Sequence, residues 1–102
     1  MTFGTTVRHL RQYKKLTLRK FAQLVELSPS YVSLMERDIQ PPPSEAAIVR
    51  IAAVLDRDPD WLLAQAGKVS SELLAIIVTD PTGVARWLRR IYKKSNLKAP
   101  PV

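Results

Sequence analysis

Hydrophobic residues recur at helical spacing along nearly the whole of this 102-residue chain. Phe3, Val7 and Leu10 stand at i, i+4 and i+7, the spacing of a helix that turns one apolar face inward. No segment alternates apolar and polar residues with the period of two that is typical of half-buried strands. The pattern therefore predicts an all-α protein.

Residues with helix-capping side chains divide the apolar pattern into segments. Thr17, Ser28 and Ser44 each precede an apolar periodic stretch, where a hydroxyl can accept a hydrogen bond from an unpaired backbone N–H. Asp58 and Asp80 give the same signal, and each is followed by proline, which suits the first helical position because it has no N–H. A stop at residue 67 and a further helix from residue 70 bring the predicted number of helices to seven.

The apolar residues of these segments define a predicted core. Ala22 is small enough to let the second and third helices cross closely, and Val25, Val32 and Met35 are spaced to fill the angle between them. Trp61 is expected to fill the space beneath the fourth and fifth helices. Further positions expected to face inward are Leu18, Phe21, Ile48, Ile51, Ala52, Leu55, Leu62 and Leu63.

Residues 18–37 therefore read as a helix, a tight turn at 26–27 and a second helix opened by Ser28 and Pro29. Two helices joined in this way form a helix-turn-helix, whose second helix enters the DNA major groove with its first residues toward the bases. The prolines at 41–43 cannot continue a helix, so the chain leaves the second helix along a stiff path.

A family resemblance rests on these same residues. The segment LRKFAQLVELSPSYVSLMER resembles the helix-turn-helix of the Cro/lambda-repressor-like family, also called the XRE family. Within it, SPSYVSLMERD is similar to a serine-proline-x-tyrosine-leucine-serine-x-x-glutamate-arginine-glycine form common among bacterial members. PPPSEAAIVRIAAVLDRDPDWLLAQAG is similar to the family's proline-serine loop, fourth helix and fifth helix. The resemblance implies a five-helix lambda-repressor-like DNA-binding domain at 1–67, followed by two additional helices at 68–102.

The resemblance also implies roles for individual residues. On the recognition helix, residues 28–36, the base-facing positions are Ser28, Pro29, Ser30, Tyr31, Ser33 and Leu34. The positions expected to contact phosphate are Thr17, Arg19, Gln40 and Ser44. Arg11 and Glu36 match a structural salt bridge that ties the first helix to the third.

Two positions depart from the family pattern. Glu26 occupies the turn where glycine is usual, which predicts a mildly strained backbone or a slightly different turn. Leu18 replaces a glutamine that often binds phosphate. The base-facing surface also lacks arginine, asparagine and glutamine, the residues that read bases in a bidentate manner. We therefore expect modest base specificity, or specificity owed partly to DNA shape.

Charge is distributed unevenly along the chain, whose formal net charge is +7. Residues 1–25 carry six basic side chains and residues 81–102 carry another six, and neither segment contains an acid. All nine acidic residues lie between 26 and 80. Two basic ends favour a polyanionic partner, with nucleic acid first and an anionic membrane second.

Several classes of chemistry have little support in the composition. The chain has no cysteine and a single histidine, His9, so a thiolate metal site, a nucleophile–base pair and a cofactor site are not expected. Asp56, Asp58 and Asp60 are expected to serve helix ends rather than to hold a cation. No apolar run approaches the roughly 18 residues that span a bilayer, and no signal peptide is evident, which predicts a cytoplasmic protein.

The predicted seventh helix is amphipathic. Val84, Trp87, Leu88, Ile91 and Tyr92 share one face, and the other face carries Arg86, Arg89, Arg90, Lys93 and Lys94. Packing or dimerisation through the apolar face is the first expectation, extra contact with the DNA backbone the second, and membrane binding a distant third. The tail at 99–102 is expected to be frayed.

The sequence thus predicts a dimeric, non-enzymatic regulator of transcription that binds double-stranded DNA and acts as a repressor by occluding promoters. Two alternatives remain open. The chain could be the antitoxin of a toxin–antitoxin pair that also controls its own operator. It could instead be a protein-interaction module that has lost DNA binding and acts through its C-terminal helices.

Overall fold

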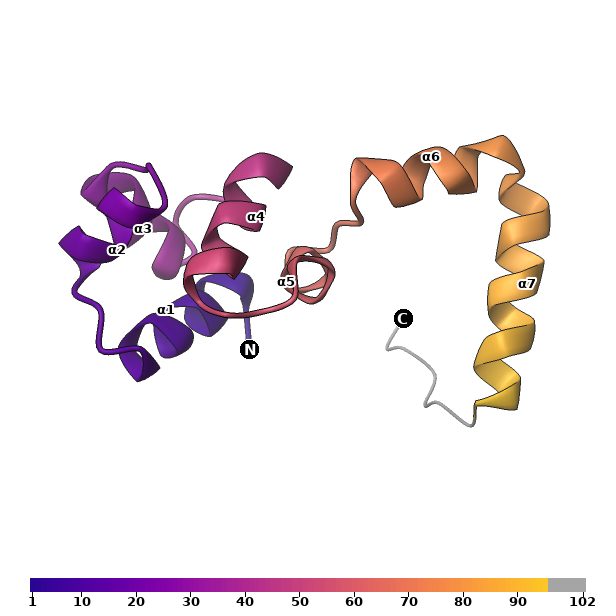
Figure 1. Ribbon diagram of the computed structural model, residues 1–102, viewed down its shortest axis with the longest axis horizontal. Coiled ribbons are helices and arrows are strands. Elements are labelled where there is room, and N and C mark those ends of the chain that lie inside the picture. The colour runs from indigo at the N-terminus through magenta and orange to yellow at the C-terminus, as the bar shows by residue number, and fades with distance from the viewer. Residues whose placement is uncertain (96–102) are drawn as a thin grey trace. The chain divides into compact units, whose positions relative to one another are not determined.

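The computed structural model describes residues 1–95, and all regular secondary structure in that range is helical (Figure 1). In chain order the helices are α1 Phe3–Tyr13, α2 Leu18–Leu24, α3 Pro29–Glu36, α4 Glu45–Val54, α5 Pro59–Gln65, α6 Ser71–Thr79 and α7 Pro81–Lys94. The predicted all-α class with seven helices is confirmed over this range. The tail at 99–102, which the sequence predicts to be frayed, lies outside the described residues.

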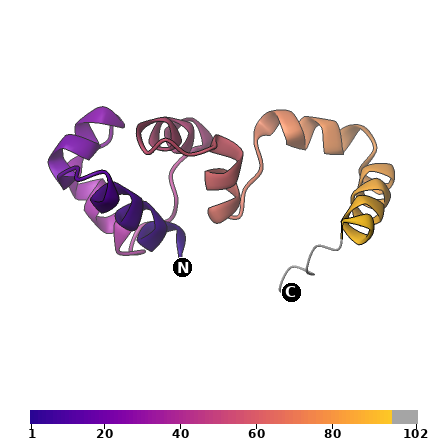
Figure 2. The ribbon, with the colours of Figure 1, turned by 60° about the horizontal axis from the view of Figure 1, so that its bottom comes forward.

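The chain folds as two compact units that divide between Ser70 and Ser71. Unit 1, Met1–Ser70, contains α1 to α5, and unit 2 contains α6 and α7. Within unit 1, α3 packs against both α1 and α2, and α4 packs against α5 (Figures 1 and 2). The helix that is predicted to read DNA is therefore supported by two others.

The predicted helix starts are confirmed by their hydrogen bonds. The hydroxyls of Thr17, Ser28 and Ser44 each accept from the backbone N–H three residues further on, at 3.1, 3.1 and 3.3 Å. The Asp58 carboxylate accepts from the next two available N–H groups, at 2.8 and 3.2 Å, and Asp80 caps α7 at 3.1 Å. Local side-chain chemistry therefore fixes where these five helices begin.

The ends of the five helices of unit 1 share one backbone geometry. A residue in the left-handed region follows each helix, and four of the five are not glycine: Lys15, Glu26, Asp38, Asp56 and Gly67, with φ between 54° and 70°. After α2, for example, Leu27 N–H donates to Ala22 O at 3.0 Å and Glu26 N–H to Gln23 O at 3.3 Å. These paired bonds satisfy carbonyls that the helix leaves open, at the cost of crowding around each non-glycine Cβ.

The core of unit 1 draws on all five helices. Its buried apolar residues are Phe3, Val7, Phe21, Ala22, Val25, Val32, Met35, Ile48, Ile51, Ala52, Leu55, Leu62 and Leu63. Gly4 marks the close approach of α1 to α3, because a Cβ there would lie 2.3 Å from the Met35 carbonyl oxygen. The predicted packing of Ala22, Val25 and Val32 at the helix crossing is confirmed.

The prediction that Trp61 belongs to this core is wrong. Its side chain is 40% exposed, and the Arg57 guanidinium lies 5.4 Å from the centre of the indole ring, which places the ring against a cation rather than beneath the helices. Leu62 and Leu63 take the inward positions of α5. A helix with 3.6 residues per turn cannot turn three consecutive side chains into one core.

Unit 2 has no buried residue in either of its helices. The helices contact each other, yet large apolar side chains remain exposed on both. They are Leu73, Leu74, Ile76, Val78, Trp87, Leu88 and Ile91. None of the described helices combines the length and the apolar character needed to cross a bilayer.

The left-handed conformation of Glu26 leads to a prediction about stability. We expect Glu26→Gly to raise the free energy of unfolding by about 1 kcal/mol, because glycine adopts a φ of 60° without the crowding that a Cβ causes. Glu26 also pairs with Arg50 at 3.5 Å, and Glu26→Ala controls for loss of this exposed pair. Urea unfolding followed by circular dichroism measures both variants. Equal stability of the Gly and Ala variants would contradict the expected strain.

Candidate nucleic-acid interface

The tip of α3 presents the first residues of the predicted recognition surface to solvent. Ser28, Pro29 and Ser30 are exposed, and Ser28 Oγ accepts the Tyr31 N–H at 3.1 Å while its own O–H remains able to donate. Ser33 and Leu34, one turn further along, are half-buried. The outward surface of α3 is therefore small and polar at its start and more apolar toward its middle.

Tyr31 is placed differently from the other base-facing candidates. Its side chain is half-buried, and its hydroxyl donates to the Pro41 carbonyl at 3.1 Å, which ties α3 to the proline segment that follows it. Burial raises the pKa of the Tyr31 hydroxyl above its ordinary value, which favours the protonated form that donates this bond. Tyr31 thus has a structural bond in addition to the base-facing position predicted for it.

The four predicted phosphate contacts are all exposed: Thr17, Arg19, Gln40 and Ser44. Thr17 and Ser44 are N-caps whose hydroxyls can still donate, and Gln40 N–H donates to Leu34 O at 3.2 Å, which holds the Gln40 backbone just beyond the C-terminal end of α3. The first turns of α2 and α3 contain no acidic residue, whereas those of α4 and α5 contain Glu45 and Asp60. The surface around α2 and α3 therefore stays receptive to anions.

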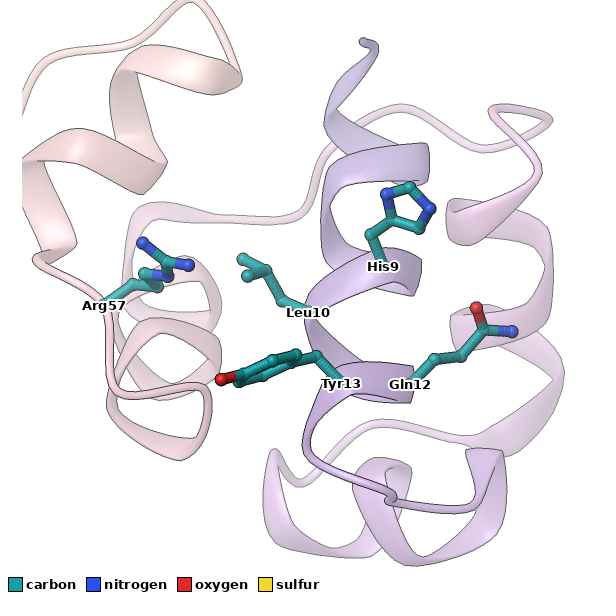
Figure 3. A pocket seen from close by; sticks show the side chains of 5 residues that line it. All are labelled: His9, Leu10, Gln12, Tyr13 and Arg57. Carbon is teal, nitrogen blue, oxygen red and sulfur yellow. The ribbon is translucent and has the colours of Figure 1, made fainter.

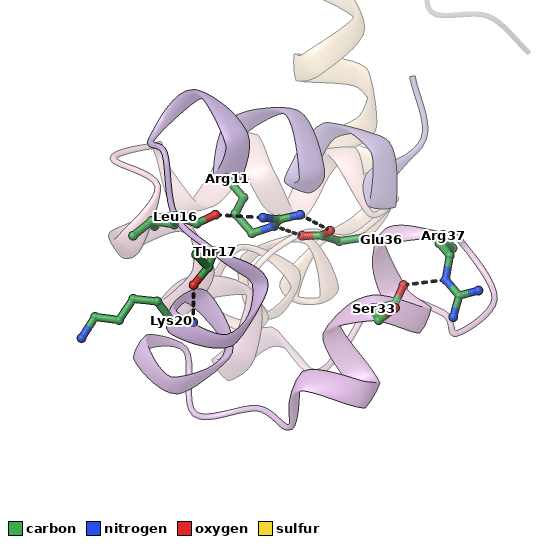
Figure 4. A network of polar contacts seen from close by, with 7 residues as sticks. All are labelled: Arg11, Leu16, Thr17, Lys20, Ser33, Glu36 and Arg37. Carbon is green, nitrogen blue, oxygen red and sulfur yellow. Dashed lines mark hydrogen bonds and ion pairs between the residues drawn. The ribbon is translucent and has the colours of Figure 1, made fainter.

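A buried ion pair lies directly behind this surface. Arg11 Nε donates to Glu36 Oε2 at 2.7 Å and a second guanidinium nitrogen donates to Glu36 Oε1 at 3.0 Å (Figure 4). A third Arg11 bond reaches Leu16 O at 2.8 Å, in the segment that leads into α2. The structure therefore brings Arg11 and Glu36 together as a bidentate bridge that joins α1, α3 and the start of α2.

A second contact fixes the same, C-terminal end of α3. Asp38, which follows the helix, accepts from the Thr2 hydroxyl at 2.6 Å and from the Gly4 N–H at 3.1 Å, both at the start of α1. With the Arg11–Glu36 bridge and the Tyr31 hydroxyl, this bond makes three attachments to a helix of eight residues. Such a short helix is marginal on its own, so these attachments and its packing give it a defined direction.

Sequence reasoning missed two arginines at this surface. Arg8 and Arg37 are exposed and line a cleft of about 150 Å³ together with Arg11, Leu18, Ser33 and Glu36. Arg37 Nε donates to Ser33 O at 3.3 Å, which holds its guanidinium beside α3 (Figure 4). The spacing of Arg8 and Arg11, three residues apart on α1, is the signal that could have placed both on one side of that helix.

A separate depression lies between α1 and the turn that joins α4 to α5. It measures about 620 Å³ and is lined by His9, Leu10, Gln12, Tyr13 and Arg57, with Leu10 and Tyr13 extending toward Arg57 (Figure 3). Close by, Lys14 forms an ion pair with Asp56. Asp56 is one of the three aspartates that the sequence predicts to serve helix ends rather than to hold a cation. Within residues 1–95, no group of three His, Cys, Asp or Glu side chains could hold a metal ion.

The comparison with known families agrees with this geometry. A family model described as a helix-turn-helix domain matches residues 2–65. The chain belongs to the helix-turn-helix domain family. The predicted resemblance to Cro/lambda-repressor-like, XRE-type proteins is confirmed, because the match covers α1 to α5 and structures of such regulators superpose on the chain.

Known relatives of this helix-turn-helix protein cover it to different extents. RamB of Mycobacterium tuberculosis, named as an HTH-type transcriptional regulator, is 31% identical over a 93-residue alignment that covers 83% of the chain. The chain spans only 19% of RamB. SinR, described as a master regulator for biofilm formation and solved in complex with DNA, is 31% identical, with a TM-score of 0.57. That match covers 61% of this chain and 98% of the SinR chain.

A second solved structure, the complex of SinR with SinI, shows the fold over a longer stretch. It covers 93% of this chain and 95% of the matched chain, with a TM-score of 0.58 and 23% identity. At that identity the likeness concerns the fold alone. Helices beyond the helix-turn-helix module are thus a shared structural feature.

The buried bridge behind α3 leads to a prediction about stability. We expect Arg11→Met and Glu36→Leu each to lower the free energy of unfolding by about 3–5 kcal/mol, because each leaves one charge buried without its partner. The double variant should recover at least about 2 kcal/mol of the summed loss, since an apolar pair of similar size needs no partner. Urea unfolding of the three variants measures the coupling. Additive losses would show that the two side chains act independently.

Proposed function

We propose that this helix-turn-helix protein binds double-stranded DNA sequence-specifically and regulates transcription. The observation that carries the proposal is the exposed tip of α3, residues 28–30, on a helix whose C-terminal end is fixed to α1 by the Arg11–Glu36 bridge and by the Asp38 carboxylate. The 31% identity to SinR, whose structure includes DNA, supports the same function for unit 1. The proposed activity includes no catalysis and no cofactor.

In the proposed complex, α3 lies in the major groove. Ser28, Ser30 and Ser33 donate to or accept from base edges, and Leu34 contacts a thymine methyl group. Arg19, Gln40 and the hydroxyls of Thr17 and Ser44 contact phosphates on either side of the groove. Arg8 and Arg37 add two cations to that phosphate-binding rim.

Unit 2 supports the proposal that the protein is a dimer. Neither of its helices has a buried residue. Trp87 is 56% exposed, and several large aliphatic side chains are exposed to a similar extent. Two copies of this surface would cover each other through a two-fold axis, the commonest symmetry of small assemblies. A dimer would also set two copies of α3 about 34–36 Å apart, one turn of the duplex.

We propose that the protein acts as a repressor, because a dimer bound across a promoter would block access to that promoter without any additional domain. A protein-interaction function is the second candidate, and the exposed apolar face of unit 2 is the observation that favours it. SinR has been solved in complex with another protein, SinI. Under this second reading the chain could be the antitoxin of a toxin–antitoxin pair, and a small protein would co-purify with it.

Selection of sites from a randomised duplex library tests the proposed function. We expect enrichment of an inverted repeat whose half-sites are about one helical turn apart. Ser30→Ala should lower affinity for the selected site roughly fivefold, about the effect of one hydrogen bond, because Ser30 is exposed at the tip of α3. Gln65→Ala, at the end of α5, is the control and should bind as the wild type does. Folded protein that enriches no motif at low salt would refute the proposal.

The proposed dimer predicts a matched pair of variants on α7. We expect Leu88→Glu, on the apolar face, to shift the protein from dimer to monomer in sedimentation velocity, because two carboxylates would be buried at the two-fold interface. Arg90→Glu introduces the same side chain on the polar face and should leave the dimer intact. Dissociation of both variants, or of neither, would contradict this interface.

A further inference from the structure

One face of α7 carries a continuous row of cations. Its members are Arg86, Arg89, Arg90, Lys93 and Lys94, all exposed and spaced at three and four residues, so their side chains follow one another along the helix. Four of them, Arg86, Arg89, Arg90 and Lys93, line one shallow surface depression of about 350 Å³. The row is thus a single basic surface rather than scattered charges.

The charges of this row are not neutralised within the described part of the chain. The ion pairs Arg11–Glu36, Lys14–Asp56 and Arg50–Glu26 all lie in unit 1, and none of them involves a residue of the row. The acidic residues of unit 2 are Glu72, in the first turn of α6, and Asp80, which is used to cap α7. Neither stands within the basic row.

Helix stability explains only part of the row. Lys93 and Lys94 lie in the last turn of α7, where cations interact favourably with the helix dipole. Arg86, Arg89 and Arg90 lie earlier in the helix, beyond the reach of that effect, and their neighbours in the row repel them. Three arginines on one exposed face, with no acidic residue among them, favour an anionic ligand.

We propose that the basic face of α7 binds the phosphate backbone of the same double-stranded DNA that α3 contacts, an inference that rests on the proposed function. From Arg86 to Lys94 the row spans about 12 Å at 1.5 Å per residue. A single DNA strand presents about three to four phosphates over that axial length. Guanidinium groups suit this ligand because each can donate two parallel hydrogen bonds to one phosphate.

The architecture of α7 favours DNA over a membrane surface. Lipid binding by an amphipathic helix requires its apolar face, which holds Trp87, Leu88 and Ile91 and which the proposed dimer uses. Binding to DNA requires only the opposite, basic face, so α7 can contact the second protomer and DNA at the same time. Residues 66–80 alone separate α5 from α7, so DNA held by unit 1 presents phosphates to α7 at high local concentration.

The inferred contact would contribute affinity without adding sequence information. The α3 surface contains no arginine, asparagine or glutamine among its predicted base contacts, so it has few groups that bind bases strongly. A phosphate-binding α7 would strengthen binding at every sequence equally and would make it more sensitive to salt.

The test replaces the three arginines that helix stability does not explain. In the full-length chain, Arg86→Gln, Arg89→Gln and Arg90→Gln are combined, because glutamine keeps the helix propensity and removes the charge. Affinity for the selected duplex is measured from 50 to 300 mM salt, roughly the range in which phosphate contacts weaken. The slope of log K against log salt should become shallower by about 5 for the proposed dimer, since each protomer loses three phosphate contacts and each contact contributes roughly 0.9.

Two controls separate charge from folding and assembly. The matched variant with lysine at the same three positions keeps the charge and should retain the wild-type slope, because counterion release depends on charge. Sedimentation velocity should give the same oligomeric state for all three proteins. The selected motif should be the same for the glutamine variant and the wild type.

The outcomes distinguish this inference from the proposed function. A motif selected by the wild type, with an unchanged slope in the glutamine variant, overturns the inference and leaves the function standing. A shallower slope without any motif supports the basic face and overturns sequence-specific binding. Binding of the wild type to phosphatidylserine vesicles that the glutamine variant loses, with an unchanged DNA slope, assigns the face to membranes instead. No binding to any duplex overturns both.

Discussion

The buried bridge between Arg11 and Glu36 determines how the recognition helix is held. Both charges are largely removed from water, so each needs the other for compensation. The planar guanidinium can donate two hydrogen bonds to one carboxylate only within a narrow range of relative orientations. The third bond, from Arg11 to Leu16 O, extends the same constraint to the segment that enters α2. The exposed tip of α3 is thereby oriented from within, and its outward side chains remain available for a ligand.

Short helices make this internal support necessary. The helices α2, α3 and α5 have seven or eight residues, a length at which an isolated helix is marginal in water. Caps at their starts and paired carbonyl bonds at their ends define them, and the common core holds them together. Four non-glycine residues accept a left-handed conformation to make these ends, so unit 1 gives up some stability for tight turns.

The two units differ in the exposure of their apolar residues. Unit 1 encloses its own core, whereas the two helices of unit 2 leave their apolar residues exposed and place cations on the opposite face of α7. The proposed arrangement, with the apolar face in a dimer and the basic face on phosphate, would let unit 2 reinforce what unit 1 binds without reading sequence itself.

The sequence by itself determined the helical class, the starts of the helices at Thr17, Ser28, Ser44, Asp58 and Asp80, and most of the core. Caps and apolar periodicity act over three or four residues, so they can be read along the chain. Only the tertiary structure decided that Trp61 lies at the surface, that Tyr31 bonds the proline segment, and that Arg8 and Arg37 flank α3. Those outcomes depend on which helices become neighbours, because a side chain's surroundings are set by segments distant in the sequence.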